Sequence, residues 1–381
     1  MKKALTALVA LMLILPLTAF AINAEDFVVS DVVDDTDKYY FYARLLMQDM
    51  SLEEKIAQMF IISPQQLAQD AFATEVNEQM AASVRDCAVG GVMLQGENII
   101  SGQQLKALSA DLQHAADKGN HIPLFIAAEE EGGYVERIAL KLGLAGTPSL
   151  RELADIGYEE DAYFHGETLA MRLKEYGMNL NFAPVGDLGD NAAAQGVKDR
   201  YTGMDAMVTA AITSKIVKGM QEHGVISAMK HFPGETGMAE NIPTSYSELI
   251  SENLLPFQNA IEQGMGMIMV SSLPVAAIDS SVPAMFSETV CEYLLREELG
   301  FEGVIITSKL SSDSVSANYS AGEAVMNAID AGCDMMLLPT DYASAHHAVL
   351  QAVKNGSIPE ERINQSVVRI LALKIISGMI E

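Results

Sequence analysis

The chain has 381 residues and carries 24 lysines and arginines against 51 aspartates and glutamates, which gives a formal charge of −27. Hydrophobic residues make up 49% of the chain, enough for a large packed core, and this excludes a disordered protein. Nucleic acids are bound by clustered lysine and arginine, so the twofold excess of acids argues against a nucleic-acid partner. The cysteines match no zinc or redox spacing, and we expect buried thiols at Cys87, Cys291 and Cys333.

The first residues are typical of a secretory signal peptide. Lys2 and Lys3 precede a short apolar run over 4–15, and small residues mark a cleavage site after Ala21. The alternative is an uncleaved anchor, but the run is short for a span of about 20 residues, and no later segment is apolar enough to cross a bilayer. We therefore expect a secreted or cell-envelope protein with a signal peptide over 1–21, a lead-in over 22–49 and a single domain over 50–381.

Short apolar runs then alternate with longer amphipathic stretches. Near-continuous apolar runs indicate strands buried on both faces, as in a parallel sheet; they lie at 59–62, 91–94, 123–127, 179–183, 225–229, 265–270, 303–306 and 334–338. Helical patterns occur at 36–55, 101–118, 151–176, 204–222, 246–263, 287–299, 320–331, 342–355 and 360–379. Eight strands separated by helices predict an α/β fold, a single-domain (β/α)₈ barrel, with an open doubly wound sheet as the alternative. Active sites of such barrels lie at the carboxyl ends of the strands.

Two strand ends carry polar side chains suited to chemistry. The third strand ends in three consecutive acids, Glu129 to Glu131, followed by a Gly-Gly turn. Adjacent like charges repel unless cations or sugar hydroxyls lie nearby, and a solvated acidic loop is the alternative. The fifth strand ends in Lys230 and His231 before a rigid Phe-Pro-Gly turn. We expect this pair to point into the barrel mouth and to donate hydrogen bonds to a polar ligand.

Further short motifs accompany these strand ends over most of the chain. Together they resemble the barrel domain of glycoside hydrolase family 3, particularly its β-N-acetylhexosaminidase branch. The motifs follow the family's order from about residue 50 to 340, and they lie at 50–58, 89–93, 131–133 with Arg137, 181–185 with Asp187, 199–200, 230–234, 299–304 and 331–334.

The resemblance implies hydrolysis of β-linked sugars with retention, by one carboxylate nucleophile and one proton donor, with no metal or organic cofactor. In this branch the nucleophile is an Asp in a Gly-Val-Ile-x-Ser-Asp-Asp-Leu-like segment. Here Ser308 occupies that position and Lys309 follows it. The branch's acid/base is a His in the loop after Lys-His-Phe-Pro-Gly, but the corresponding loop, 235–243, contains no His. Both members of the catalytic pair are therefore substituted.

The substrate contacts implied by the resemblance are partly kept. Residues similar to Arg200, Lys230 and His231 bind the sugar in the family's outermost subsite, and Glu129 replaces a shorter acid. Sugar faces commonly stack on aromatic rings. Because the chain has no Trp, that role falls to Tyr134 or Tyr201.

A serine at position 308 is neutral at pH 7, so we expect the loss of the covalent route to reduce the rate by many powers of ten. A Ser308–Lys309 nucleophile is disfavoured because adjacent residues of a strand point to opposite faces. Substitute carboxylates near the strand ends are Glu235, Glu240 and Asp313.

Three functions stay open. The first is an exported, non-catalytic family member that binds a carbohydrate, a peptidoglycan fragment or a protein partner. The second is an active β-N-acetylhexosaminidase, or another O-glycosyl hydrolase, that uses displaced carboxylates. The third is a purely structural role.

Overall fold

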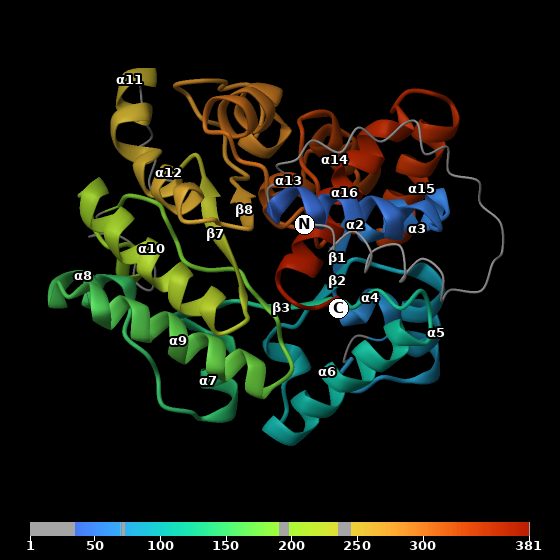
Figure 1. The fold of residues 1–381 in the computed structure, drawn as a ribbon, viewed down its shortest axis with the longest axis horizontal. Coiled ribbons are helices and arrows are strands. Elements are labelled where there is room, and N and C mark those ends of the chain that lie inside the picture. The colour runs from blue at the N-terminus through green and yellow to red at the C-terminus, as the bar shows by residue number, and fades with distance from the viewer. Residues whose placement is uncertain (1–34, 69, 71–72, 190–197, 235–244, 381) are drawn as a thin grey trace, which may run out of the picture. The chain divides into compact units, whose positions relative to one another are not determined.

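The computed structural model in Figure 1 describes residues 35–68, 70, 73–189, 198–234 and 245–380. Residues 39–381 form one compact unit, and the fold is given for that unit. The expected signal peptide lies outside the described residues, as do Glu235 and Glu240.

Eight parallel strands form the centre of this unit. They are β1 (Phe60–Ile62), β2 (Gly91–Met93), β3 (Phe125–Ala128), β6 (Leu180–Asn181), β7 (Ile226–Phe232), β8 (Met267–Val270), β9 (Val304–Thr307) and β10 (Met336–Leu337). From β1 to β9 each strand pairs with the next along the chain, and β10 pairs with β1. A parallel bridge between Ile306 and Met335 joins the β9 and β10 ends, which closes the sheet. All eight predicted strands and the barrel are confirmed, and the open sheet is wrong.

Helices surround the strands, as Figure 1 shows. They are α2 (Asp35–Gln48), α3 (Leu52–Gln58), α4 (Pro64–Ala68), α5 (Glu78–Cys87), α6 (Gly102–Asp117), α7 (Arg137–Leu142), α8 (Leu150–Ile156), α9 (Glu159–Glu175), α10 (Ala206–Glu222), α11 (Tyr246–Glu248), α12 (Leu255–Glu262), α13 (Asp313–Ser316), α14 (Ala321–Asp330), α15 (Tyr342–Lys354) and α16 (Glu360–Ile376). Two further segments, η4 (Leu249–Asn253) and η6 (Thr289–Glu298), are π-helical. The nine expected helical stretches are all present.

Three expected helical stretches are divided into shorter helices, and four observed helices, α4, α5, α7 and α13, were not predicted. The 246–263 stretch comprises α11, η4 and α12. In the 36–55 stretch, α2 ends at Gln48 and α3 begins after Ser51. The hydroxyl and backbone N–H of Ser51 form a capping box with Glu54. The 151–176 stretch breaks at Gly157, which adopts φ 75°. Helix α5 buries only Met80 and Val84, too few apolar positions to produce a clear helical period.

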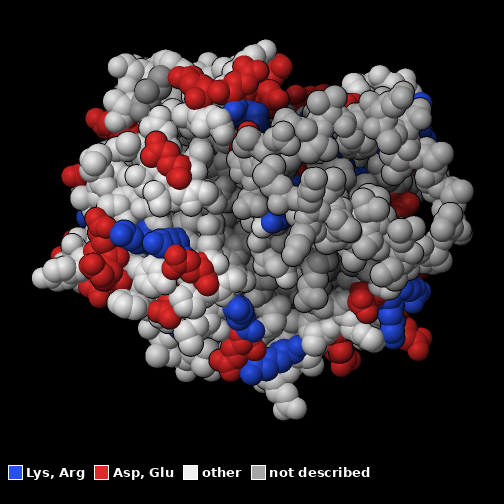
Figure 2. Space-filling view, in the orientation of Figure 1, with Lys and Arg blue, Asp and Glu red and all other residues white. Residues whose placement is uncertain are grey.

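Almost every strand residue is buried, so the core fills the barrel and the space beneath the helices. Cys291 and Cys333 are buried as predicted, but Cys87 is only half-buried. Acidic and basic side chains are interspersed on the face shown in Figure 2, with no broad basic surface among the residues described there. Within the described part of the chain, no helix is both long and apolar enough to cross a membrane.

Candidate functional site

A short hairpin after β3 positions the three consecutive glutamates. Its strands, β4 (Glu130–Gly132) and β5 (Val135–Glu136), pair antiparallel around a Gly-Gly turn. Gly133 has φ 59°, and a Cβ there would lie 2.6 Å from the Ser149 side chain, so the turn requires glycine. The Glu129 side chain is 13% exposed and the other two are more deeply buried. A solvated acidic loop is therefore excluded.

Glu130 has a structural role. Its carboxylate accepts hydrogen bonds from the backbone N–H groups of Ile138 (2.9 Å) and Ala139 (3.1 Å) in the first turn of α7 and from Arg172 at 2.9 Å. Burial raises the pKa of Glu130 despite these contacts. The carboxylate thus fixes the start of α7 against the barrel.

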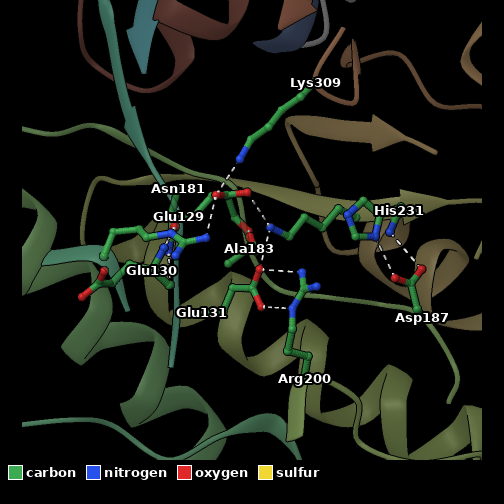
Figure 3. A network of polar contacts seen from close by, with 12 residues as sticks. Glu129, Glu130, Glu131, Asn181, Ala183, Asp187, Arg200, His231 and Lys309 are labelled. Carbon is green, nitrogen blue, oxygen red and sulfur yellow. Dashed lines mark hydrogen bonds and ion pairs between the residues drawn. The ribbon is translucent and has the colours of Figure 1, made fainter. Parts of the chain in front are cut away.

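Glu131 lies between two cations. Arg200 donates to both carboxylate oxygens, from Nε at 2.8 Å and Nη2 at 2.9 Å (Figure 3), and Lys230 Nζ lies 2.7 Å from Oε1. Burial alone would raise the pKa of Glu131, but the charges of Lys230 and Arg200 outweigh it and lower that pKa. This carboxylate is ionised at neutral pH.

Glu129 is held by cations from three parts of the chain. Lys309 Nζ donates to Oε2 at 2.9 Å (Figure 3), Lys230 Nζ lies 3.5 Å from Oε1, and Arg137 Nη2 lies 3.7 Å from Oε2. Burial would raise the pKa of Glu129, but Lys230 and Lys309 together hold it well below its usual range. The barrel mouth therefore contains two ionised carboxylates.

His231 is oriented by a buried aspartate. Asp187 Oδ1 accepts the backbone N–H of His231 at 3.0 Å, and Oδ2 lies 2.8 Å from the imidazole Nδ1 (Figure 3). Asp187 is 1% exposed, whereas His231 lines a cavity. A carboxylate at Nδ1 fixes the orientation of the imidazole ring and favours the tautomer that carries a proton on Nδ1. The Lys230–His231 peptide bond is cis.

These groups surround a cavity of about 310 Å³ at the carboxyl ends of the strands, which we call the mouth cavity. Its lining residues are Glu129, Glu131, Val135, Arg137, Arg200, His231, Met269, Ser272, Ser308, Lys309 and Ser312. A larger cavity of about 380 Å³ lies between α2 and α16 and contains none of the strand-end motif residues. Among the residues that the structure describes, no cluster of three or more His, Cys, Asp or Glu side chains could hold a metal ion.

The structure brings most of the predicted site residues together. Ser308, Glu129, Arg200 and His231 line the mouth cavity, and Lys230 lies beneath it between the two carboxylates. The Tyr134 side chain, on the β4–β5 turn, is 67% exposed and is not among the lining residues. Tyr201 is buried, and Asp313 is exposed at the start of α13.

Residues 308 and 309 both line the mouth cavity. Strand β9 ends at Thr307, so the alternation of a strand does not extend to either residue. The Ser308 hydroxyl donates to the Val270 carbonyl at 2.8 Å, and the Lys309 ammonium is directed to Glu129.

Sequence reasoning did not assign Arg137, Asp187 or Lys309 to the site. The first two fall within the motifs that carry the family resemblance, which was the available signal. Lys309 departs from the family pattern, and only the fold shows that it reaches across the cavity to Glu129.

Comparisons with known proteins agree with this architecture. The sequence model of the glycosyl hydrolase family 3 N-terminal domain matches residues 51–373. The chain is 33% identical over 295 residues to a β-hexosaminidase of Stenotrophomonas maltophilia (72% of this chain, 84% of that protein), and 27% identical over 339 residues to β-hexosaminidase LpqI of Mycobacterium tuberculosis (85% and 83%).

A solved structure of a family 3 β-N-acetylglucosaminidase from Paenibacillus superposes with a TM-score of 0.80 at 32% identity. The match covers 86% of this chain and 63% of that one. A β-N-acetylhexosaminidase from Beutenbergia cavernae gives a TM-score of 0.75 at 26% identity, with coverage of 87% and 99%.

Proposed function

Because the chain belongs to glycoside hydrolase family 3, we propose that it binds a carbohydrate in the mouth cavity without hydrolysing it. The names of its relatives make an N-acetylhexosamine the ligand to test first, and a peptidoglycan fragment that contains such a sugar is the second. One observation carries the proposal. At the position where the family resemblance places the nucleophile, the cavity presents the neutral Ser308, followed by the cation Lys309.

Ser308 is poorly suited to attack an anomeric carbon. Its hydroxyl proton is donated to a main-chain carbonyl rather than to a side-chain base, and a glycosylated serine would be a poor leaving group. A neutral hydroxyl also supplies no negative charge to an oxocarbenium-like transition state. The neighbouring Lys309 supports Glu129 instead of the hydroxyl.

The two ionised carboxylates of the cavity are engaged. Glu131 is held by Arg200 and Lys230, and Glu129 by Lys309 and Lys230. If either carboxylate attacked a sugar, its oxygen would lose contact with at least one cation in a largely buried site. Breaking such an ion pair costs free energy. Their lowered pKa values also exclude both as proton donors at neutral pH.

One observation favours an active glycosidase as the second candidate. The Asp187–His231 pair places an oriented imidazole at the edge of a cavity that also contains carboxylates, and an imidazole is suited to general acid catalysis near neutral pH. In this reading His231 would protonate the leaving group and Glu129 or Glu131 would be the displaced nucleophile.

Hydrolysis of an aryl N-acetyl-β-glucosaminide, measured beside calorimetry with N-acetylglucosamine, tests the proposal. We expect saturable binding and no turnover by the wild type, and regained turnover by Ser308→Asp. Wild-type turnover that disappears in Glu129→Gln, Glu235→Gln or Glu240→Gln would overturn the non-catalytic proposal. So would a carboxylate found glycosylated by mass spectrometry after exposure to a fluorinated sugar.

We also infer that the protein is exported. The basic and apolar start of the chain and the small residues before Ala21 support this. Removal of that segment would take the formal charge from −27 to −29, because it contains Lys2 and Lys3 and no acid. N-terminal sequencing of protein recovered from the cell envelope or medium should begin at Ile22, whereas an intact Met1 would contradict export by cleavage.

A further inference from the structure

The mouth cavity has an excess of cationic hydrogen-bond donors. Three cations line it, Arg137, Arg200 and Lys309, against the two carboxylates of Glu129 and Glu131. A fourth cation, Lys230, contacts both carboxylates from beneath. This local excess of positive charge contrasts with the whole chain, which carries a formal charge of −27.

The carboxylate acceptors are largely occupied. Each oxygen of Glu131 accepts a hydrogen bond from Arg200, and one of them also contacts Lys230. In Glu129, one oxygen accepts from Lys309 and the other faces Lys230 at 3.5 Å. A neutral sugar hydroxyl that donated to either carboxylate would share an oxygen that a cation already contacts.

Several donors remain open to the cavity. The Arg137 guanidinium makes no hydrogen bond to any residue that the structure describes; its nearest carboxylate oxygen, on Glu129, is 3.7 Å away, and its side chain is 45% exposed. The ammonium of Lys309, with three donors, makes one hydrogen bond within the described part of the chain and is 33% exposed. Because both side chains are partly exposed and line the cavity, they can contact a ligand without a change in the buried core.

We propose that the mouth cavity prefers a sugar with an anionic substituent, a carboxylate or a sulfate, and that Arg137 and Lys309 determine this preference. The inference rests on the proposed function, because it names the class of sugar that the cavity takes. An anionic group would form ion pairs with Arg137 and Lys309, whose donors are now open. Unlike a hydroxyl, a carboxylate or sulfate can also accept two parallel hydrogen bonds from the Arg137 guanidinium.

The segment after β9 supports the same preference. Where the resembled family has two adjacent acids, this chain has the neutral Ser308 and the cationic Lys309. Acids at these positions would repel a negatively charged substituent, whereas the present pair removes that repulsion and adds an attraction. A cavity of about 310 Å³ lies at the lower end of the range for small-molecule sites, about 300 to 1,000 Å³, and suits a monosaccharide.

Calorimetry on the full chain with two matched sugar pairs tests the inference. The pairs are N-acetylglucosamine with its 6-sulfate, and glucose with glucuronic acid; the two pairs separate a sulfate preference from a carboxylate preference. In at least one pair the anionic sugar should bind about tenfold more tightly than its neutral partner, which corresponds to about 1.4 kcal/mol. Lys309→Met and Arg137→Met should each remove most of this difference.

Lys106→Met is the matched control, because it removes the same charge from a surface pair with Glu175 outside the mouth cavity. It should leave the preference unchanged, and thermal unfolding should show that all three variants are folded.

If neutral and anionic sugars bind equally, this inference is wrong and the proposed function stands. If no sugar binds, both are wrong. If Lys106→Met reduces the preference as much as Lys309→Met, net charge rather than the cavity selects the ligand, and the assignment to these two residues is overturned.

Discussion

Both ends of the barrel contain buried carboxylates surrounded by cations, but the two ends use them differently. At the amino ends of the strands, Asp334 is fully buried and accepts hydrogen bonds from Arg296 (2.8 Å), Arg369 (3.0 Å), Ser366 (2.7 Å) and the backbone N–H of Ile305 (3.0 Å). At the carboxyl ends, the carboxylates instead border the mouth cavity.

The arginines at the amino end also bind main-chain groups. Arg296 donates to the carbonyl of Gly303 at 2.8 Å. Arg362 donates to the carbonyl of Cys333 at 2.7 Å and lies 3.9 Å from Asp334. These contacts tie η6 and α16 to the starts of β9 and β10. At the mouth, by contrast, the donors of Arg137 and Lys309 face a cavity.

The two buried lysines show the same contrast. Lys230, at the mouth, contacts two carboxylates. Lys374, at the amino end, is fully buried, and the polar and ring contacts of its ammonium with described residues are the Gln58 side chain (2.9 Å), the Gly90 carbonyl (3.0 Å) and the face of the Phe125 ring (4.7 Å to the centroid). Burial therefore lowers the pKa of Lys374 to about 7. The amino-end contacts therefore stabilise the fold, whereas the contacts at the mouth leave donors of Arg137 and Lys309 open to the cavity.

The largest effect should come from Asp334→Asn. Removal of the buried charge leaves Arg296 and Arg369 without their anionic partner, and breaking a buried pair in this way costs about 3–5 kcal/mol. Urea unfolding measures the loss. The matched change at the mouth, Glu129→Gln, should cost less than half as much, because Lys309 and Arg137 can turn to solvent; equal losses would erase the distinction between the two ends.

Lys374→Met should change how stability depends on pH. The folded-state pKa, about 7, lies below the unfolded value of about 10.4, so between these values the unfolded chain binds more protons and wild-type stability rises with pH. Relative to Lys374→Met, the wild type should gain about 2–3 kcal/mol between pH 7 and 9. Urea unfolding at several pH values tests this, and parallel curves for the two proteins would contradict it.

Glu131→Gln should alter the acid limb of the stability curve. The folded-state pKa of Glu131 is lowered, so its stabilisation is present above the unfolded value of about 4.3 and is lost as pH falls through the folded value. Arg200 is 23% exposed and Lys230 keeps its contact with Glu129, so the variant should be less stable than the wild type by about 1.5–3 kcal/mol at pH 6. The difference should narrow as the pH falls below about 4. A constant difference would mean that the carboxylate charge does not stabilise the mouth.

The smallest effect should come from Tyr134→Ala. The ring is 67% exposed and lies outside the lining of the mouth cavity, so stability should change by no more than about 0.5 kcal/mol. Sugar affinity should change less than twofold. A larger loss of affinity would show that the ring stacks on the bound sugar, as the sequence led us to expect, and would extend the site beyond the cavity.

Much of this could be predicted from the sequence. The eight apolar runs predicted the strands because strands buried on both faces consist mostly of apolar residues, and the order of strands and helices predicted the barrel. The short motifs gave the family and identified Ser308 as the substituted position. Helix α5 was missed because it buries only Met80 and Val84. Helices α4, α7 and α13 were missed because, at 5, 6 and 4 residues, they are too short to show a helical period.

The sequence by itself determined the barrel and the family, and it is the basis for predicting that Ser308 replaces the nucleophile, since these depend on local patterns of polarity and on residue identity. Only the tertiary structure decided which glutamate serves the fold and which the cavity. Glu129, Glu130 and Glu131 are chemically alike and adjacent, and cations from distant segments reach all three. Their roles differ because Glu129 and Glu131 line the mouth cavity, whereas Glu130 is not among the lining residues and accepts N–H groups at the start of α7. Electrostatic effects of this kind depend on distances of a few ångströms between groups far apart in the chain, which a linear sequence does not specify.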